Sequence, residues 1–402
     1  MKNKNGARHL HAADLHGVAR LALGAIEIVL DQAEALHGRV LRVRALRAVG
    51  SITGFAFRQL RHGTATATRW SDLRLADGGS GAPLSTAERE AVLAAVNGLF
   101  GDQLSDAGNP LAIRMRLRAD GTPLALEKPA LAASIDKPQA KIVVLVHGLC
   151  RCDLQWRRAG HDHGQALAHD LGYSALYLHY NSGRHISTNG REFSDLMEQL
   201  VAAWPVPVEQ VAILGHSMGG LVARSACYYA KEQGHAWLRR LEHMVFLGTP
   251  HQGAPLERHG NWLGGVMGRS TLTAPLARLG QLRSAGITDL RYGNLVDQDW
   301  QGRDRFEHGE DLRLPVPLPK GVRCYAVAGT TGRRLGDIRD RLLGDGVIPL
   351  DTALGVHHDP ARTLRFPKTR QFVAFGIHHL DLLSRAEVYD RIRHWLGAAP
   401  RK

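Results

Sequence analysis

Ser217 is the residue whose surroundings in this sequence most strongly indicate covalent chemistry. It lies in a Gly-His-Ser-Met-Gly segment, residues 215–219, which follows the apolar run 211–214 and precedes a helix-forming stretch at 221–226. A buried strand, a sharp turn carrying Gly-x-Ser-x-Gly and a helix together form a nucleophile elbow. The glycines avoid the clash that Cβ atoms would make with the adjoining strand and helix. The motif therefore predicts Ser217 as a nucleophile rather than an incidental serine in a tight glycine turn.

A serine hydroxyl needs a base to remove its proton and an acid to orient that base. In chains with this kind of elbow, the acid follows the serine and the histidine comes last. Asp345 is our candidate acid, because Gly344 and Gly346 flank it and let the turn aim its carboxylate inward. Asp351 and Asp337 are the alternative acids. The explanation without a catalytic role is that Asp345 belongs to an Asp-Gly turn and faces water.

Two adjacent histidines are candidates for the base. His378 and His379 come directly after the apolar run 371–375 and before a C-terminal helical pattern. This is where the last strand of a parallel sheet would deliver a histidine to the elbow. The position alone leaves the choice between the two open.

The tetrahedral intermediate of acyl transfer needs hydrogen-bond donors aimed at its oxyanion. The backbone N–H of Met218, directly after the proposed nucleophile, is one candidate. The N–H of Leu149 is the other, because Gly148 lets the loop after an apolar strand turn over the site. His147, Gly148 and His216 are further candidates for substrate binding. Cys150 has no base assigned to it, so we interpret it as part of the pocket wall.

From residue 141 onward, strand patterns alternate with helical patterns, which predicts a parallel sheet flanked by helices. The expected strands are 141–146, 174–178, 211–214, 244–247, 323–328 and 371–375. The expected helices are 164–170, 192–204, 221–232 and 386–396. The fold class is therefore α/β, with the strands of one sheet spread over residues 138–400.

The segment 253–314 loses both periodicities and gains Gly, Pro and Arg. A long irregular insertion after a strand is the usual position of an active-site lid. Trp262, Leu263 and Met267 are its candidate substrate-binding residues, since apolar side chains there would line a lid or acyl pocket.

Residues 1–137 are expected to form a mainly helical extension. Apolar residues over 18–36 recur at helical spacing and give one apolar face. A second helix is expected at 87–99 and a short strand near 113–117. The apolar face of the first helix has three candidate uses: docking on the main domain, pairing with another copy, or lying on a membrane. The oligomeric state stays open.

The composition is that of a globular protein, with 44% hydrophobic and 22% charged residues among 402. No apolar stretch is long enough to span a bilayer, and no signal peptide is recognised, so we expect a cytoplasmic protein. The net charge of +13 is scattered, with no nucleic-acid-binding motif. It supports at most a weak association with an anionic membrane surface.

The four cysteines are expected as thiols, and we expect neither a metal nor a cofactor, because no histidine cluster has zinc-site spacing.

Together these motifs resemble the α/β-hydrolases of the serine esterase and lipase kind. More closely, the chain resembles bacterial lipase-like proteins grouped with the GPI inositol-deacylase-like hydrolases. Two further stretches carry the resemblance: Tyr-Asn-Ser-Gly-Arg-His-Ile-Ser at 180–187, and Leu-Gly-Thr-Pro-His-Gln-Gly-Ala-Pro at 247–255. It covers about residues 138–398. The family places its catalytic histidine just before Leu-Asp, which favours His379 over His378.

The expected function is a carboxylic-ester hydrolase, an esterase or lipase, that forms an acyl-enzyme on Ser217 with small-molecule or lipid esters. One alternative is an acyltransferase that uses the same triad. Another is a catalytically idle hydrolase fold that serves as a binding or membrane-surface module.

Overall fold

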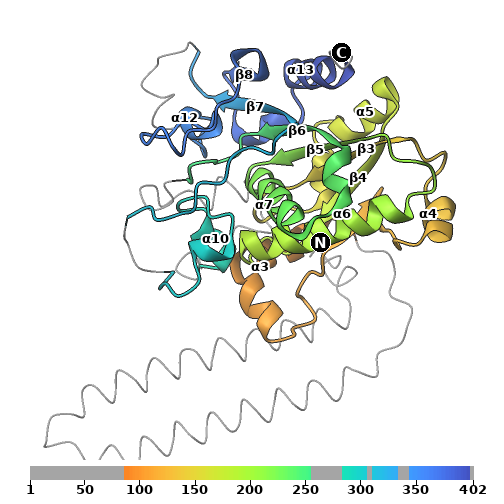
Figure 1. Cartoon of the computed structure of the whole chain (residues 1–402), viewed down its shortest axis with the longest axis horizontal. Helices are drawn as coiled ribbons and strands as arrows, with labels where there is room; N and C mark the ends of the chain where they lie inside the picture. The colour runs from red at the N-terminus through yellow and green to blue at the C-terminus, as the bar shows by residue number, and fades with distance from the viewer. Residues whose placement is uncertain (1–85, 255–282, 306–309, 334–343, 399–402) are drawn as a thin grey trace, which may run out of the picture. The chain divides into compact units, whose positions relative to one another are not determined.

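The computed structural model describes residues 86–254, 283–305, 310–333 and 344–398 (Figure 1). By internal contacts the chain divides into two units. One comprises Glu90–Asp102 and Ile113–Lys402, and the other Met1–Arg89 and Gln103–Ala112. The predicted helix at 18–36 lies outside the described residues. The predicted domain boundary between residues 137 and 138 stays a prediction.

The described residues form an eight-stranded sheet in the order β2-β1-β4-β3-β5-β6-β7-β8. From β4 to β8 all neighbouring strands are parallel, whereas β1 is antiparallel to both β2 and β4. The strand bounds are β1 Arg116–Ala119, β2 Thr122–Pro123, β3 Lys141–Val146, β4 Ser174–His179, β5 Gln210–His216, β6 Leu241–Leu247, β7 Arg323–Thr330 and β8 Gln371–Phe375. The predicted parallel sheet is confirmed, and its strands at 141–146 and 371–375 have the predicted bounds.

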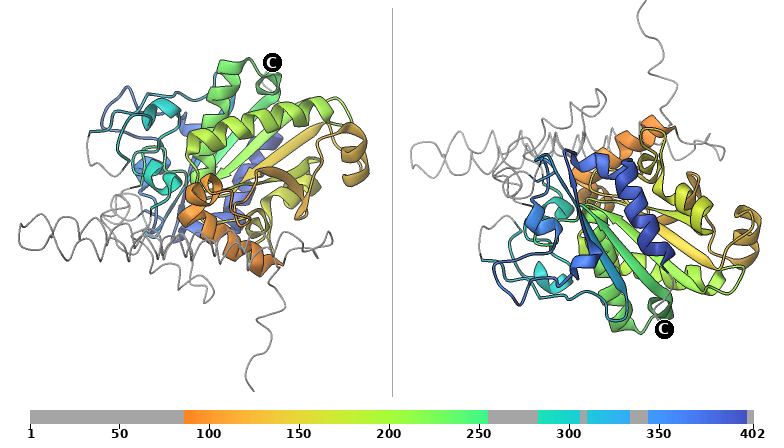
Figure 2. Two further views of the ribbon diagram at one scale, coloured as in Figure 1. Left: turned by 90° about the horizontal axis from the view of Figure 1, so that it is seen from below. Right: turned by 90° about the horizontal axis from the view of Figure 1, so that it is seen from above.

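Helices cover both faces of the sheet, which explains why β3 and β5 are apolar along almost their whole length. Helices α5 and α13 contact each other on one face, and α6 and α7 contact each other on the opposite face (Figures 1 and 2). The α-helices are α3 Ala87–Asp106, α4 Lys128–Ser134, α5 His163–Leu171, α6 Ile186–Ala203, α7 Met218–Gln233, α10 Ala285–Asp289, α12 Leu350–Ala353 and α13 Ala386–Gly397. None of the described helices is long and apolar enough to cross a membrane.

The five predicted helices from 87 onward are confirmed, and the short ones were missed. Helices α4, α10 and α12 have seven, five and four residues, too few for a helical period to show in the sequence. The 3₁₀ turns are also too short to show a helical period. They are η3 Asp153–Trp156, η4 Ala236–Arg240, η5 Asp297–Asp299, η6 Lys368–Arg370 and η7 His379–Leu383. Helix α3 is capped by Thr86, whose hydroxyl accepts from the N–H of Arg89.

The described end of the 253–314 insertion is fixed to the start of α6. Asp289 of α10 is buried, and its carboxylate accepts from the backbone N–H of Ile186 at 2.8 Å. The N–H of Gly286 donates to the carbonyl of Gly183 at 2.9 Å. The lid candidates Trp262, Leu263 and Met267 lie outside the described residues, so their role stays a prediction.

The pH dependence of stability follows from histidines that burial keeps neutral. Burial lowers the pKa of His147 to about 3 and that of His163, the first residue of α5, to about 4. In the unfolded chain the pKa of each histidine is about 6.5. Between the folded and the unfolded pKa the unfolded state binds more protons than the folded state. The stability that these neutral histidines contribute is therefore fully present above the unfolded pKa of about 6.5 and is lost as the pH falls toward the folded pKa.

We expect His163→Gln to reduce the loss of stability between about pH 7.5 and about pH 5 by about 2 kcal/mol. Unfolding in urea measures the free energy of unfolding at both pH values. The difference between the two values is then compared between the variant and the wild type. The exposed His169→Gln is the control. An unchanged pH dependence in His163→Gln would contradict this origin.

Candidate active site

Ser217 lies in a strained turn between β5 and α7. Its backbone angles are φ 54° and ψ −127°, a region that residues other than glycine rarely occupy. The turn is held from behind, because the N–H of Ser217 donates to the carbonyl of Leu247 at 2.9 Å. The residue is 7% exposed. Strain of this kind persists only where the surrounding structure enforces it, and it is common at functional sites.

The two motif glycines are required by close backbone approach. A Cβ atom on Gly215 would lie 2.5 Å from the Cα of Gly220, and one on Gly219 would lie 2.1 Å from the carbonyl oxygen of Val146. Helix α7 therefore starts directly against β3 and β5. The turn that presents Ser217 can form only because these positions carry no side chain.

Asp345 follows β7 and is 1% exposed. Its Oδ1 accepts hydrogen bonds from the backbone N–H groups of Val347 at 3.0 Å and Ile348 at 2.8 Å. These bonds leave Oδ2 for one further donor. Of the two alternatives, Asp351 is exposed on α12, and Asp337 lies outside the described residues.

That donor is His379, whose Nδ1 lies 2.7 Å from Asp345 Oδ2. The backbone N–H of His379 also donates to the carbonyl of Asp345 at 3.0 Å. His379 is buried, whereas His378 is exposed and its N–H donates to the carboxylate of Asp381. The geometry thus brings together the acid and one histidine from the predicted set.

The bond to Asp345 determines which ring nitrogen of His379 can act as a base. Because a carboxylate only accepts hydrogen bonds, Nδ1 carries the proton and Nε2 carries a lone pair. Nε2 is buried and has no hydrogen-bond partner among the described residues. Gly248 makes room for the ring, since a Cβ there would lie 3.0 Å from two of its atoms. The ring centroid of His216 lies 4.6 Å away.

The loop after β3 approaches Ser217 closely. A Cβ on Gly148 would lie 2.9 Å from the Cβ of Ser217, so only glycine fits there. Leu149 and Met218, the predicted oxyanion donors, are buried. Met218 is the first residue of α7, so its N–H has no acceptor within the helix. Neither N–H donates a hydrogen bond to a described residue.

The loop is held by side chains of the β4–α6 connection. Cys150 has a φ of 58°, and its N–H donates to the hydroxyl of Ser182 at 3.1 Å. The hydroxyl of Tyr180 donates to the carbonyl of His147 at 2.7 Å, and the two rings stack 4.3 Å apart. Burial raises the pKa of the Cys150 thiol to about 12, which disfavours a thiolate nucleophile. All four cysteines are free thiols, as predicted.

His147, Gly148 and His216 line one small cavity beside the elbow. Burial, and secondarily the neighbouring His379, hold the pKa of His216 well below its usual value, so its ring is neutral. The other residues that line this small cavity were not predicted from the sequence. They are Arg151, Cys152, Gln155, Trp156 and Leu383. The first four come from the segment after β3, Leu383 ends η7, and no local motif distinguishes any of them.

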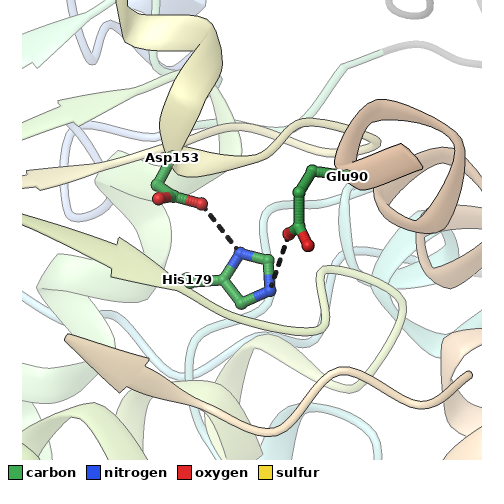
Figure 3. Close-up of side chains that lie close together, drawn as sticks. All are labelled: Glu90, Asp153 and His179. Carbon is green, nitrogen blue, oxygen red and sulfur yellow. Dashed lines mark hydrogen bonds and ion pairs between the residues drawn. The ribbon is translucent and has the colours of Figure 1, made fainter. Parts of the chain in front are cut away.

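One group in the described part of the chain has the composition of a metal site. Glu90 of α3, Asp153 of η3 and His179 at the end of β4 place their ligand atoms within 4.8 Å of one another (Figure 3). The His179 Nδ1 lies 2.9 Å from Asp153, and its Nε2 lies 3.5 Å from Glu90. Arg118 Nη1, however, is 3.0 Å from Glu90 and 3.1 Å from Asp153. The guanidinium therefore supplies the positive charge that a metal would otherwise provide.

The strand order, the strained serine after the central strand β5 and the His–Asp pair after the last two strands define the α/β-hydrolase fold. Residues 137–305 match the family model of the PGAP1-like alpha/beta domain, which confirms the family resemblance expected from the motifs.

Solved structures of similar fold include lipases and esterases. The mature Bacillus licheniformis lipase is 16% identical, over 66% of this chain and 94% of that chain, with a TM-score of 0.40. The Pyrobaculum calidifontis esterase is 14% identical, over 66% and 77% of the two chains, with a TM-score of 0.37. A search of curated proteins found no match.

The buried network of Arg118, Glu90, Asp153 and His179 gives a stability prediction. We expect Arg118→Met to lower the free energy of unfolding by about 3–5 kcal/mol, because it leaves two buried carboxylates without their cation. Urea unfolding measures the loss. Arg393→Met, which removes an exposed arginine paired with Asp390, is the control and should cost little. Recovery of Arg118→Met by added Mg²⁺, Ca²⁺ or Zn²⁺ would instead identify the group as a metal site.

Proposed function

We propose that this protein is a serine carboxylic-ester hydrolase. In this mechanism His379 Nε2 accepts the proton of Ser217 as the hydroxyl oxygen attacks the ester carbonyl. The imidazolium then protonates the leaving alcohol, and an acyl-enzyme remains on Ser217. A water molecule, deprotonated by His379, releases the carboxylic acid and restores the serine.

The observation that carries the proposal is the buried pair of His379 and Asp345, in a chain whose Ser217 has a strained backbone after the central strand β5. The 2.7 Å bond from Nδ1 keeps the imidazole in the tautomer whose Nε2 can accept a proton. The same carboxylate stabilises the imidazolium that forms after proton transfer. The site is buried, which strengthens this electrostatic effect.

The N–H groups of Leu149 and Met218 are the proposed oxyanion donors. They come from two elements that Gly148 brings into contact beside Ser217. Such backbone donors are fixed before the reaction, so they stabilise the developing charge without reorganisation.

We propose short- to medium-chain acyl or lipid-like esters as substrates, of the carboxylesterase or triacylglycerol-lipase type. The cytoplasmic location and the weak membrane association also stay proposals.

Ser217→Ala tests the nucleophile. We expect it to reduce hydrolysis of p-nitrophenyl acyl esters by a factor on the order of 10⁶, because the acyl-enzyme cannot form. Labelling of the protein by a fluorophosphonate probe should be lost as well. Ser134→Ala, at an exposed serine that ends α4, is the matched control. Turnover that persists in a folded Ser217→Ala protein would refute the mechanism.

Asp345→Asn tests the acid. An amide in place of Oδ2 can donate to Nδ1 and so favours the wrong tautomer of His379, which should lower kcat about 10⁴-fold. The control is Asp351→Asn, the exposed alternative from the same segment, which should leave kcat unchanged. Steady-state kinetics on p-nitrophenyl butyrate compare the two. If the loss followed Asp351 instead, the acid would have to be reassigned.

A further inference from the structure

A second cavity, of about 570 Å³, lies apart from the residues of the proposed active site. Its lining comes from α7, the loop after β6, the segment before β7 and the connection between β7 and β8. None of the proposed catalytic, oxyanion or small-cavity residues is among them. The volume is within the range of about 300–1,000 Å³ that small-molecule sites occupy.

The lining of this cavity is strongly basic. It contains Arg224, Arg313, Arg362 and Arg365, together with His251, and no aspartate or glutamate among the described lining residues. Burial holds the pKa of His251 well below its usual value, so its imidazole is neutral. The charge of the lining is therefore carried by guanidinium groups.

Arg224 of α7 is a buried cation that makes no ion pair within the described part of the chain. The residue is 5% exposed, and it makes no ion pair with a described carboxylate. Its Nη2 donates to the carbonyl of Val316, its Nη1 lies 3.4 Å from His251 Nδ1, and its Nε has no partner among the described residues. Burial lowers its pKa to about 9, so the group is still charged at neutral pH. A buried charge is costly unless an opposite charge accompanies it.

Of the three other arginines of the lining, two are paired with described carboxylates and one is not. Arg313 and Arg362 share one carboxylate, that of Asp311, at 2.7 Å and 3.2 Å. Arg362 also lies 3.5 Å from Asp359. Arg365 is exposed at the edge of the cavity and forms no ion pair with a described residue. Positive charge thus remains both at the buried end, on Arg224, and at the edge.

We propose that this cavity binds the phosphate group of a small molecule. Guanidinium groups donate in a planar fork that matches the oxygens of phosphate, and phosphate offers more acceptors and more charge than a carboxylate. Leu314, Val316 and Leu364 line the same cavity and provide apolar surface beside the arginines. The phosphate belongs either to a free phosphate ion or to the headgroup of a lipid-like molecule.

Isothermal titration of the full chain tests the proposal with three probes at constant ionic strength: inorganic phosphate, hexyl phosphate and hexanoate. Hexyl phosphate has no carboxylic ester, so Ser217 cannot consume it and the result is independent of the proposed hydrolase activity. We expect saturable binding of at least one phosphate probe. Tighter binding of hexyl phosphate identifies a lipid-like source, and equal binding identifies free phosphate.

Three variants locate the bound phosphate. Arg224→Met and Arg365→Gln should each weaken binding about tenfold or more, because each removes a charged donor. Arg365 is exposed, so its variant keeps the test valid if Arg224→Met does not fold. Arg385→Gln removes an exposed arginine next to α13, outside the cavity, and should leave the affinity unchanged.

Three results would overturn the proposal. The first is the absence of saturable binding of either phosphate probe. The second is wild-type affinity in Arg365→Gln and, if Arg224→Met folds, in that variant as well. This result would place the phosphate elsewhere. The third is binding of hexanoate as tight as that of hexyl phosphate, which would exclude selectivity for phosphate.

Discussion

The close approach of helix α7 to strands β3 and β5 is the constraint on which the site depends. Gly219 lets the helix start against the carbonyl of Val146, and the chain can then pass from strand to helix only through the strained backbone of Ser217. Because β5 is central and the strands from β3 to β8 are parallel, the loops after β3, β6, β7 and β8 all leave the same edge of the sheet as that turn. Glycines therefore fix the position of the serine, and the sheet places the loops that carry the proposed acid and base at the same edge.

The electrostatics of the region follow from what burial does to each group. Burial keeps His147, His216 and His251 uncharged, so the interior contains many imidazoles but few charges. Two groups of buried carboxylates are matched by donors or by a cation. Asp345 is surrounded by two N–H donors and the ring of His379, and the carboxylates of Glu90 and Asp153 share Arg118. Asp153 follows the loop that carries Leu149, so the network also fixes the end of that loop.

Sequence patterns predicted what depends on local order. The strands, the longer helices and the elbow each have a period or a motif of their own, and the sheet confirms them. The network around Arg118 joins residues separated by 28 and 35 positions, and no pattern links them. The arginine-lined cavity is likewise assembled from four distant segments, in a chain whose many arginines are scattered. Long-range charge pairing leaves no periodic signal, so it appears only once the chain is folded.

One loop connects the proposed active site with the basic cavity. Gly248, at the start of this loop, has a φ of 57° and lies against the ring of His379. Three residues later His251 lines the cavity, and the N–H of His251 and that of Gln252 donate to the carbonyl and hydroxyl of Thr352 in α12. Helix α12 follows the turn that holds Asp345, so the loop is braced from the acid side as well. The loop from Gly248 to Gln252 therefore contacts both the ring of His379 and the lining of the basic cavity, and α12 holds it in place.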